Sequence, residues 1–313
     1  MAMTQHNQHH PVMLEEALSG LNIQSDGFYI DGTLGRGGHA SAILERLSDS
    51  GRLLLMDKDP QAIQYAEQGI ATDARVSLHH GSFTDMRKVV RELEWQGKVS
   101  GILLDLGVSS PQLDDPQRGF SFKQSGPLDM RMNTAAGMSA AEWLAQAEAR
   151  EITQVLREYG EERFAKRIAN AIVREREQAP IDTTQRLATI IAAANPRHEK
   201  GKDPATRSFQ AIRIFINQEL DDIKATLTQV IDLLAPGGRL VVISFHSLED
   251  RLIKRFIREQ SRGDDFPPDL PITHIQLQPK LKAVGKAHHA SDAEIKQNVR
   301  ARSAVLRVAE RIA

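Results

Sequence analysis

Four short apolar runs in the first third of the chain each stop at a small or acidic residue, and the stops are regularly spaced. The runs end at Asp31, Asp57, Gly81 and Asp105, so the steps between them are 26, 24 and 24 residues. A step of that length holds one β-strand and one helix, the repeat of a parallel sheet with helices on its faces. Such sheets bind ligands at the carboxyl ends of their strands, so we expect the acids to line one crevice.

The other strand-like segments indicate a doubly wound, Rossmann-like α/β fold with a mostly parallel sheet. Strands are expected at 28–31, 52–57, 75–80, 100–106, 238–246 and 303–310. Between residues 114 and 203 the strand signal disappears, and the sequence becomes rich in Arg and Glu. We therefore predict a sheet domain made of residues 1–113 and 204–313, interrupted by an inserted, mostly helical domain at 114–203. Ser247 is expected to be a helix N-cap, because Asp250 follows three residues later.

The composition excludes several classes of protein. The 313 residues include no cysteine, which rules out disulfides and thiolate chemistry. The polar N-terminus lacks the apolar core of a signal peptide, and no apolar run reaches membrane-spanning length, so we expect a cytoplasmic protein without a membrane partner. The formal net charge of −1 leaves nucleic-acid binding to a local basic face. His6, His9 and His10 have no further ligand at metal-binding spacing, so no metal site is expected; whether the chain forms a homodimer stays open.

The glycine-rich loop "GRGGHA" that follows the first strand points to the kind of cofactor. It lacks the Gly-Lys-Ser/Thr ending of an NTP-binding P-loop. It matches the dinucleotide pattern through Gly35, Gly37 and Ala40, and Asp57 follows Gly35 by 22 residues, so a NAD-dependent oxidoreductase remains an alternative. Asp31 at the mouth of the loop would repel a pyrophosphate. S-adenosylmethionine carries an ammonium, a sulfonium and a ribose but no phosphate, so the three acids favour it as the cofactor.

Residues after the third and fourth strands complete the expected site. Phe83 is placed to lie against an adenine ring or to pack in the core, and the sequence does not decide between the two. Ser109, Ser110 and Pro111 put small polar groups and a rigid turn close after Asp105. This stretch resembles, in part, the Asp/Ser/Asn-Pro-Pro-aromatic loop of enzymes that methylate exocyclic amines. An acceptor for the amine hydrogens localises the nitrogen lone pair, so these four residues are the candidate catalytic group.

Long motifs in the same order along nearly the whole chain resemble the bacterial RsmH (MraW) family. They include "DGTLGRGGHA", "DLGVSSPQLDDPQRGFSF", "YGEERFAKRIA", "PATRSFQAIRIFIN" and "SFHSLEDR". The resemblance implies an S-adenosylmethionine-dependent methyltransferase that acts on N4 of a decoding-centre cytidine (cytidine 1402) of 16S rRNA in the small ribosomal subunit. It also implies a set of cofactor contacts: Gly37, Gly38, His39, Asp57, Phe83, Asp105 and Gln112.

The predicted insertion carries a basic stripe that suits RNA. Arg163, Arg167 and Arg174 recur at helical spacing on one stripe, and apolar residues form another. An ordinary solvated helix face explains these charges about as well as an RNA contact does. Phe120 is a candidate platform for stacking a base, with packing in the core of the insertion as the alternative. An RNA-binding ribosome assembly factor without catalysis therefore stays as a second alternative, which methyl transfer to small-subunit particles would distinguish.

Overall fold

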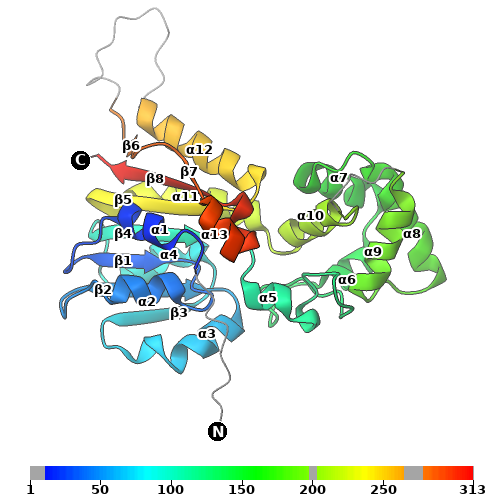
Figure 1. Ribbon diagram of the computed structural model, residues 1–313, viewed down its shortest axis with the longest axis horizontal. Coiled ribbons are helices and arrows are strands. Elements are labelled where there is room, and N and C mark those ends of the chain that lie inside the picture. The colour runs from blue at the N-terminus through cyan, green and yellow to red at the C-terminus, as the bar shows by residue number, and fades with distance from the viewer. Residues whose placement is uncertain (1–10, 197–202, 264–277, 313) are drawn as a thin grey trace, which may run out of the picture. The chain divides into compact units, whose positions relative to one another are not determined.

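The computed structural model describes residues 11–196, 203–263 and 278–312 (Figure 1). His6, His9 and His10 lie outside these ranges. The chain divides into two compact units. Unit 1 consists of Met1–Gly107 and Asp221–Ala313, and unit 2 consists of Val108–Leu220.

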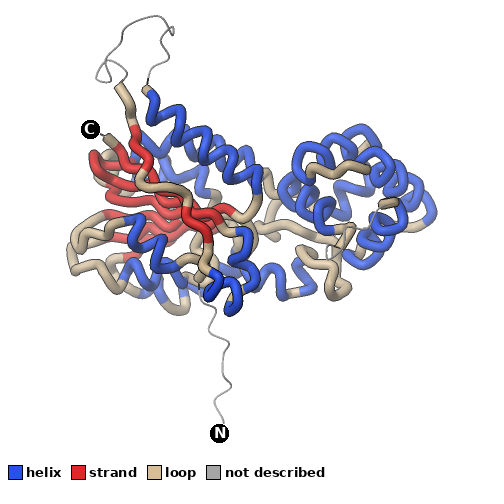
Figure 2. The backbone as a smooth tube through the Cα atoms, turned by 45° about the horizontal axis from the view of Figure 1, so that its top comes forward, coloured by secondary structure: helices blue, strands red, loops and turns tan. Residues whose placement is uncertain are grey.

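Unit 1 is built on one mostly parallel sheet, which Figure 2 shows in red. Its order is β3-β2-β1-β4-β5-β8-β6, and β7 also pairs with β8. The strands β1 to β5 pair with one another in parallel, whereas β8 runs antiparallel to β5, β6 and β7. The bounds are β1 (Phe28–Asp31), β2 (Arg52–Asp57), β3 (Val76–His80), β4 (Val99–Asp105), β5 (Leu234–Ser244), β6 (Leu281–Ala283), β7 (His288–His289) and β8 (Val305–Arg311).

Helices cover the central strands of this sheet. Leu53, Leu54, Leu55 and Met56 in β2 are all fully buried, which is the pattern of a strand packed on both faces. The long amphipathic α12 packs against β5, β6 and β8, and α1 packs against β4, β5 and β8. The helices of unit 1 are α1 (Leu14–Leu21), α2 (Gly38–Leu44), α3 (Pro60–Glu67), α4 (Met86–Glu92), most of α11 (Glu219–Leu233), α12 (Ser247–Arg262) and α13 (Asp292–Gln297).

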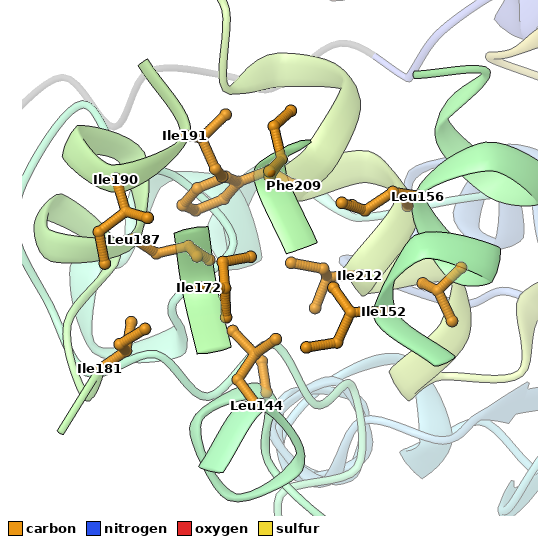
Figure 3. Packing of buried hydrophobic residues seen from close by; sticks show 14 of the residues in the cluster. Leu144, Ile152, Leu156, Ile172, Ile181, Leu187, Ile190, Ile191, Phe209 and Ile212 are labelled. Atoms are coloured by element: carbon orange, nitrogen blue, oxygen red, sulfur yellow. The ribbon is translucent and has the colours of Figure 1, made fainter. Parts of the chain in front are cut away.

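Unit 2 is helical and has an apolar core of its own. Leu156, Ile172, Leu187 and Ile212 come from four different helices and meet in that core (Figure 3). The helices are α5 (Ser110–Asp114), α6 (Ala140–Gln146), α7 (Ala149–Gly160), α8 (Ala165–Gln178), α9 (Thr184–Ala194) and α10 (Thr206–Ile216). Because these side chains bury their apolar surface against one another, unit 2 has the internal packing of an independent domain.

The α/β fold class and the six expected strands are confirmed, and three details differ from the sequence prediction. The strands β6 and β7 were not expected. Unit 2 is wider than the range 114–203, because α10 packs into its core through Phe209 and Ile212. The N-cap of α12 is His246 rather than Ser247, and the acid that accepts from the backbone at this end is Glu249.

None of the helices in the described residues combines the length and apolar character that a membrane crossing requires.

Candidate functional site

Three acids end neighbouring strands at one edge of the sheet in unit 1, as the spacing predicted. Asp31 ends β1, Asp57 ends β2 and Asp105 ends β4, and β1 lies between the other two. Parallel pairing places these ends in register, since Asp31 is level with Leu55 and Leu103. The three carboxyl groups therefore share one edge, where like charges act on one another.

Asp31 is almost completely buried and is held by the loop that follows it. Its Oδ1 accepts a hydrogen bond from the Thr33 backbone N–H at 3.0 Å. The pKa of this carboxyl is raised to about 7, mainly because burial removes its hydration; the Thr33 hydrogen bond opposes the shift and the nearby Asp57 adds to it. The site therefore holds an acid that is partly protonated near neutral pH.

Asp57 connects the second strand to the glycine-rich loop. Its Oδ2 accepts from the Gly35 backbone N–H at 2.8 Å, and its Oδ1 accepts from the Asp59 backbone N–H, also at 2.8 Å. Gly35 has a positive φ of 53°, which a residue without a Cβ adopts at little cost. Burial raises the pKa of Asp57 to about 6, against the effect of these two donors. The loop and the acid thus fix each other's position.

Asp105 differs from the other two acids because its carboxyl has few partners. Its backbone N–H donates to Thr33 Oγ1 at 2.6 Å, but its buried Oδ1 has no hydrogen-bond partner among the described residues. Burial raises the pKa of Asp105 well above its ordinary value, and the charges of Asp31 and Glu249 add to the shift. An unpartnered, buried carboxyl oxygen is costly unless a ligand satisfies it.

His39 lies next to Asp105 at the start of α2. Its Nε2 is 3.1 Å from the Val12 carbonyl oxygen, which can only accept, so the hydrogen-bonded form carries its proton on Nε2. Its Nδ1 lies 3.8 Å from Asp105 Oδ2. The preceding Gly37 is the N-cap of α2 with a positive φ of 74°. A Cβ on Gly38 would lie only 2.3 Å from Pro11, so the loop packs closely on the chain before α1.

Phe83 follows β3 in a short 3-10 helix (Phe83–Asp85) and is half-buried. A Cβ on Gly32 would lie 3.2 Å from the Phe83 Cβ, so this aromatic residue sits beside the loop that follows Asp31. The structure therefore brings together, within unit 1, every predicted cofactor residue except Gln112. These residues are Asp31, Gly35, Gly37, Gly38, His39, Asp57, Phe83 and Asp105.

The predicted Ser-Ser-Pro loop belongs to unit 2, where it starts the short helix α5. Ser109 is the N-cap of α5, and its backbone N–H donates to Gln112 Oε1 at 2.8 Å. Pro111 stands in the first turn, where its fixed φ suits a helix start. Ser109 is only four residues beyond Asp105, so the chain keeps their Cα atoms within about 14 Å of each other.

The predicted RNA residues of unit 2 fall into two groups. Arg163, Arg167 and Arg174 are exposed, and the Arg174 guanidinium lies 3.0 Å from Glu175. Phe120 is buried in the core of unit 2, with the Arg118 guanidinium 5.7 Å from its ring centre. This packing leaves the Phe120 ring without an open face for a base, so the structure favours the core alternative for this residue.

Two residues that support the site were not identified from the sequence. Thr33 donates to Asp31 through its backbone and accepts from the Asp105 backbone through its hydroxyl, which links two strand ends. The segment Asp31-Gly32-Thr33 has the composition of an Asx turn, and that signal was available. Glu249 is fully buried and accepts from the Phe245 backbone N–H at 2.8 Å. Its charge raises the pKa of Asp105 only because tertiary packing brings the two acids together, and no local sequence signal indicates that contact.

The arrangement suits a cationic ligand. Three carboxyl groups share a poorly hydrated edge, and the pKa of each is raised. A positive charge placed among them would favour the ionised forms and relieve the mutual repulsion. A pyrophosphate would add negative charge to the same place. The ammonium and sulfonium groups of S-adenosylmethionine therefore fit these residues, including the unpartnered oxygen of Asp105.

Comparison with known proteins agrees with this chemistry. The chain is 57% identical over 312 residues to the ribosomal RNA small subunit methyltransferase H of Pseudoalteromonas atlantica, covering 99% of this chain and all of that protein. It is 55% identical over 304 residues to the protein of the same name from Coxiella burnetii, covering 97% and 99% of the two chains. A solved structure of a putative rRNA methylase from Clostridium thermocellum aligns over both full chains at 11% identity and a TM-score of 0.46. The model of the MraW methylase family matches residues 6–312, and this chain therefore belongs to that family of S-adenosylmethionine-dependent methyltransferases.

Proposed function

We propose that this enzyme methylates N4 of a decoding-centre cytidine, cytidine 1402, of 16S rRNA in the small ribosomal subunit. The observation that supports S-adenosylmethionine as the methyl donor is the group of three acids with raised pKa at the carboxyl ends of β1, β2 and β4, beside the glycine-rich loop. The N4 position and the cytidine follow from the resemblance of the sequence motifs to the family. The names of the relatives support a small-subunit rRNA substrate. A ribosomal substrate implies that the enzyme acts in the cytoplasm.

In this proposal, different residues of unit 1 bind different parts of the cofactor. Asp57 stands at the spacing of a ribose-binding acid, so its carboxylate accepts from the ribose hydroxyls. Asp31 and Asp105 face the ammonium and sulfonium charges, and Phe83 lies against the adenine ring. The backbone of the loop borders the methionine part of the cofactor through Gly35, Gly37, Gly38 and His39, and Gln112 reaches it from α5.

The residues after β4 carry the chemistry. When bound, S-adenosylmethionine supplies a methyl group, so an N–C bond forms as the S–C bond breaks. The exocyclic amine of cytosine is a poor nucleophile because its lone pair is delocalised into the ring. Asp105 and the loop of Ser109, Ser110 and Pro111 accept the amine hydrogens and align the nitrogen with the methyl group. The amine proton passes to Asp105 or to water during or after transfer.

Unit 2 holds the RNA in this proposal. The exposed stripe of Arg163, Arg167 and Arg174 on and before α8 contacts phosphates, and the target base is turned out of its stack to reach the donor. The two alternatives, a NAD-dependent oxidoreductase and a non-catalytic assembly factor, gain no support from the matched relatives.

Mass mapping of 16S rRNA nucleosides from cells with and without this protein tests the proposal. We expect one methyl group on N4 of one cytidine to disappear with the protein. Wild-type protein should restore it on purified small-subunit particles with S-adenosylmethionine, and the Asp105→Asn variant should restore it far more slowly. An unchanged methylation map, or a methyl group lost from another atom, contradicts the proposed substrate.

A further inference from the structure

Unit 1 is electrically polarised along its sequence although the whole chain is nearly neutral. Residues 1–107 contain nine Lys or Arg and 14 Asp or Glu, a formal charge of −5. Residues 247–313 contain 13 Lys or Arg and nine Asp or Glu, a formal charge of +4. This asymmetry within one unit is typical of a protein that presents one basic region to a polyanion.

The positive charge gathers on the outer face of α12. Arg251, Arg255, Arg258 and Arg262 are exposed and recur at steps of 4, 3 and 4 residues, so they form one stripe along the helix. Lys254 is also exposed beside this stripe. The opposite face, with Ile253 and Ile257, is buried. At 1.5 Å per residue the stripe is roughly 16 Å long, enough to follow several phosphates of a nucleic-acid backbone.

The acids of α12 do little to neutralise this basic stripe. Glu249 is fully buried and accepts from the backbone at the start of the helix. Asp250 forms a bidentate ion pair with Arg307, with distances of 2.6 and 3.0 Å. Glu259 is the one exposed acid of the helix, and its Oε1 lies 3.5 Å from Arg255. Lys254, Arg258 and Arg262 are exposed and pair with none of these three acids.

The neighbouring strand adds to the same region. The Lys280 backbone N–H donates to the Gln260 carbonyl at 3.0 Å, which ties the chain before β6 to the end of α12 (Figure 1). The Lys280 side chain is exposed. An exposed base therefore lies close to the C-terminal end of α12, where the stripe ends.

The side chains on this surface favour RNA over a lipid membrane. The exposed residues of α12 are Ser247, Arg251, Lys254, Arg255, Arg258, Glu259 and Arg262. None of them is apolar, whereas a helix that binds a membrane surface buries an apolar face in the lipid. Here the apolar face of α12 is already used against the sheet.

We propose that the basic stripe of α12 is an RNA-backbone contact of unit 1, separate from the stripe on α8 in unit 2. The proposal rests on the proposed function, in which the substrate is RNA within the small ribosomal subunit. Contacts to phosphates position a protein without reading sequence. The stripe therefore anchors the donor-binding unit itself on the RNA and does not depend on unit 2.

The test is a triple variant that removes charge and keeps the aliphatic stems, Lys254→Gln, Arg258→Gln and Arg262→Gln. A matched control removes three exposed bases from the acidic part of unit 1: Lys88→Gln, Arg91→Gln and Lys98→Gln. Both variants change the net charge by the same amount, so they differ only in the place of the lost charges. Circular dichroism and S-adenosylmethionine binding by calorimetry verify that both variants fold as the wild type does.

Binding is measured on small-subunit particles from cells that lack this protein, over a range of salt concentrations. Each phosphate contact contributes roughly 0.7–0.9 to the slope of log affinity against log salt, so the stripe variant should lose roughly two to three units of slope. Its affinity at low salt should fall roughly ten- to hundredfold, while the control stays within about twofold of the wild type. The control variant should transfer methyl groups to the particles at the wild-type rate.

Two results would overturn the proposal. One is equal affinity and equal salt slope for the stripe variant and the control. The other is that the wild-type protein binds vesicles rich in anionic phospholipid more tightly than the stripe variant does, while the two bind the particles equally. Failure of the proposed function itself looks different, because wild-type protein would then neither bind nor methylate the particles.

Discussion

Binding of S-adenosylmethionine should be coupled to proton release from the acids at the sheet edge. In the free protein the pKa of Asp31 is raised to about 7 and that of Asp57 to about 6. A cationic cofactor binds best when both groups are ionised. At about pH 6 some nine-tenths of Asp31 and half of Asp57 would be protonated, so their protons must leave on binding. The affinity should therefore weaken as the pH falls.

The size of the effect follows from these two values. Between about pH 7 and about pH 6 the ionised fraction of Asp31 falls roughly five- to sixfold and that of Asp57 roughly twofold. The product is a loss of affinity of roughly tenfold, or about 1.4 kcal/mol. The α-amino group of the ligand stays mostly charged over this range, since such groups titrate near roughly 7.7–8.0. The change in affinity thus reports on the protein.

Calorimetry in two buffers with different ionisation enthalpies measures both the affinity and the number of protons released. The Asp31→Asn variant is the matched control, because the amide oxygen can still accept from Thr33 but cannot titrate. Its affinity should change only about twofold over the same range. A wild-type affinity that is independent of pH, with no protons released, would refute the reasoning.

The same acid makes a prediction about stability. The pKa of Asp31 in the folded protein, about 7, lies above the ordinary value of 3.8. The folded state therefore holds this proton more tightly, so the contribution to stability is full below about pH 4 and is lost as the pH rises through about 7. Asp31→Asn should thus gain thermal stability relative to the wild type as the pH rises from about 5 to about 8. A constant difference in melting temperature across this range would contradict the assigned shift.

Three substitution experiments address the remaining roles. Asp57→Ala should weaken S-adenosylmethionine binding roughly tenfold or more, since losing a charged hydrogen bond costs about 1.5–3 kcal/mol, and an unchanged affinity by calorimetry would remove Asp57 from the site. Asp105→Asn should lower the single-turnover rate at saturating cofactor and RNA by roughly 10²–10⁴-fold, and a wild-type rate would limit Asp105 to binding. Changing Arg163, Arg167 and Arg174, on and before α8, to Glu should weaken RNA binding and flatten its salt dependence without changing cofactor affinity. Unaltered RNA affinity at low salt would mean that these side chains face only solvent.

The sequence predicts the sheet of unit 1 well because its central strands are buried on both faces. Such strands read as short apolar runs, and a parallel sheet forces a nearly constant length of chain between them. The ends of those runs then locate Asp31, Asp57 and Asp105 at one edge without any knowledge of packing. The strands β6 and β7 escape prediction for the opposite reason. They are short, mostly exposed pieces beside β8, and sequences such as "LKA" and "HH" carry no apolar run.

The boundary of unit 2 is harder to predict because amphipathic helices look alike whichever core they join. The apolar face of α10, with Phe209 and Ile212, has the same spacing whether it packs on the sheet or on α7. Its membership in unit 2 is decided by tertiary contacts. The same holds for Phe120, whose aromatic ring suits a base or a core equally until the surrounding side chains are placed.

The partners of the three acids also differ in a way that a sequence motif does not convey. Asp57 accepts from two backbone N–H groups and Asp31 from one, so the fold itself orients these two carboxyl groups. Asp105 has a buried oxygen without a donor among the described residues, and two further acids raise its pKa. A buried carboxyl oxygen without a hydrogen-bond donor adds no stability to the fold, and groups of this kind are expected where function requires them. We infer that Asp57 and Asp31 form the prepared part of the cofactor site, and that Asp105 obtains its partner only when ligand and substrate arrive.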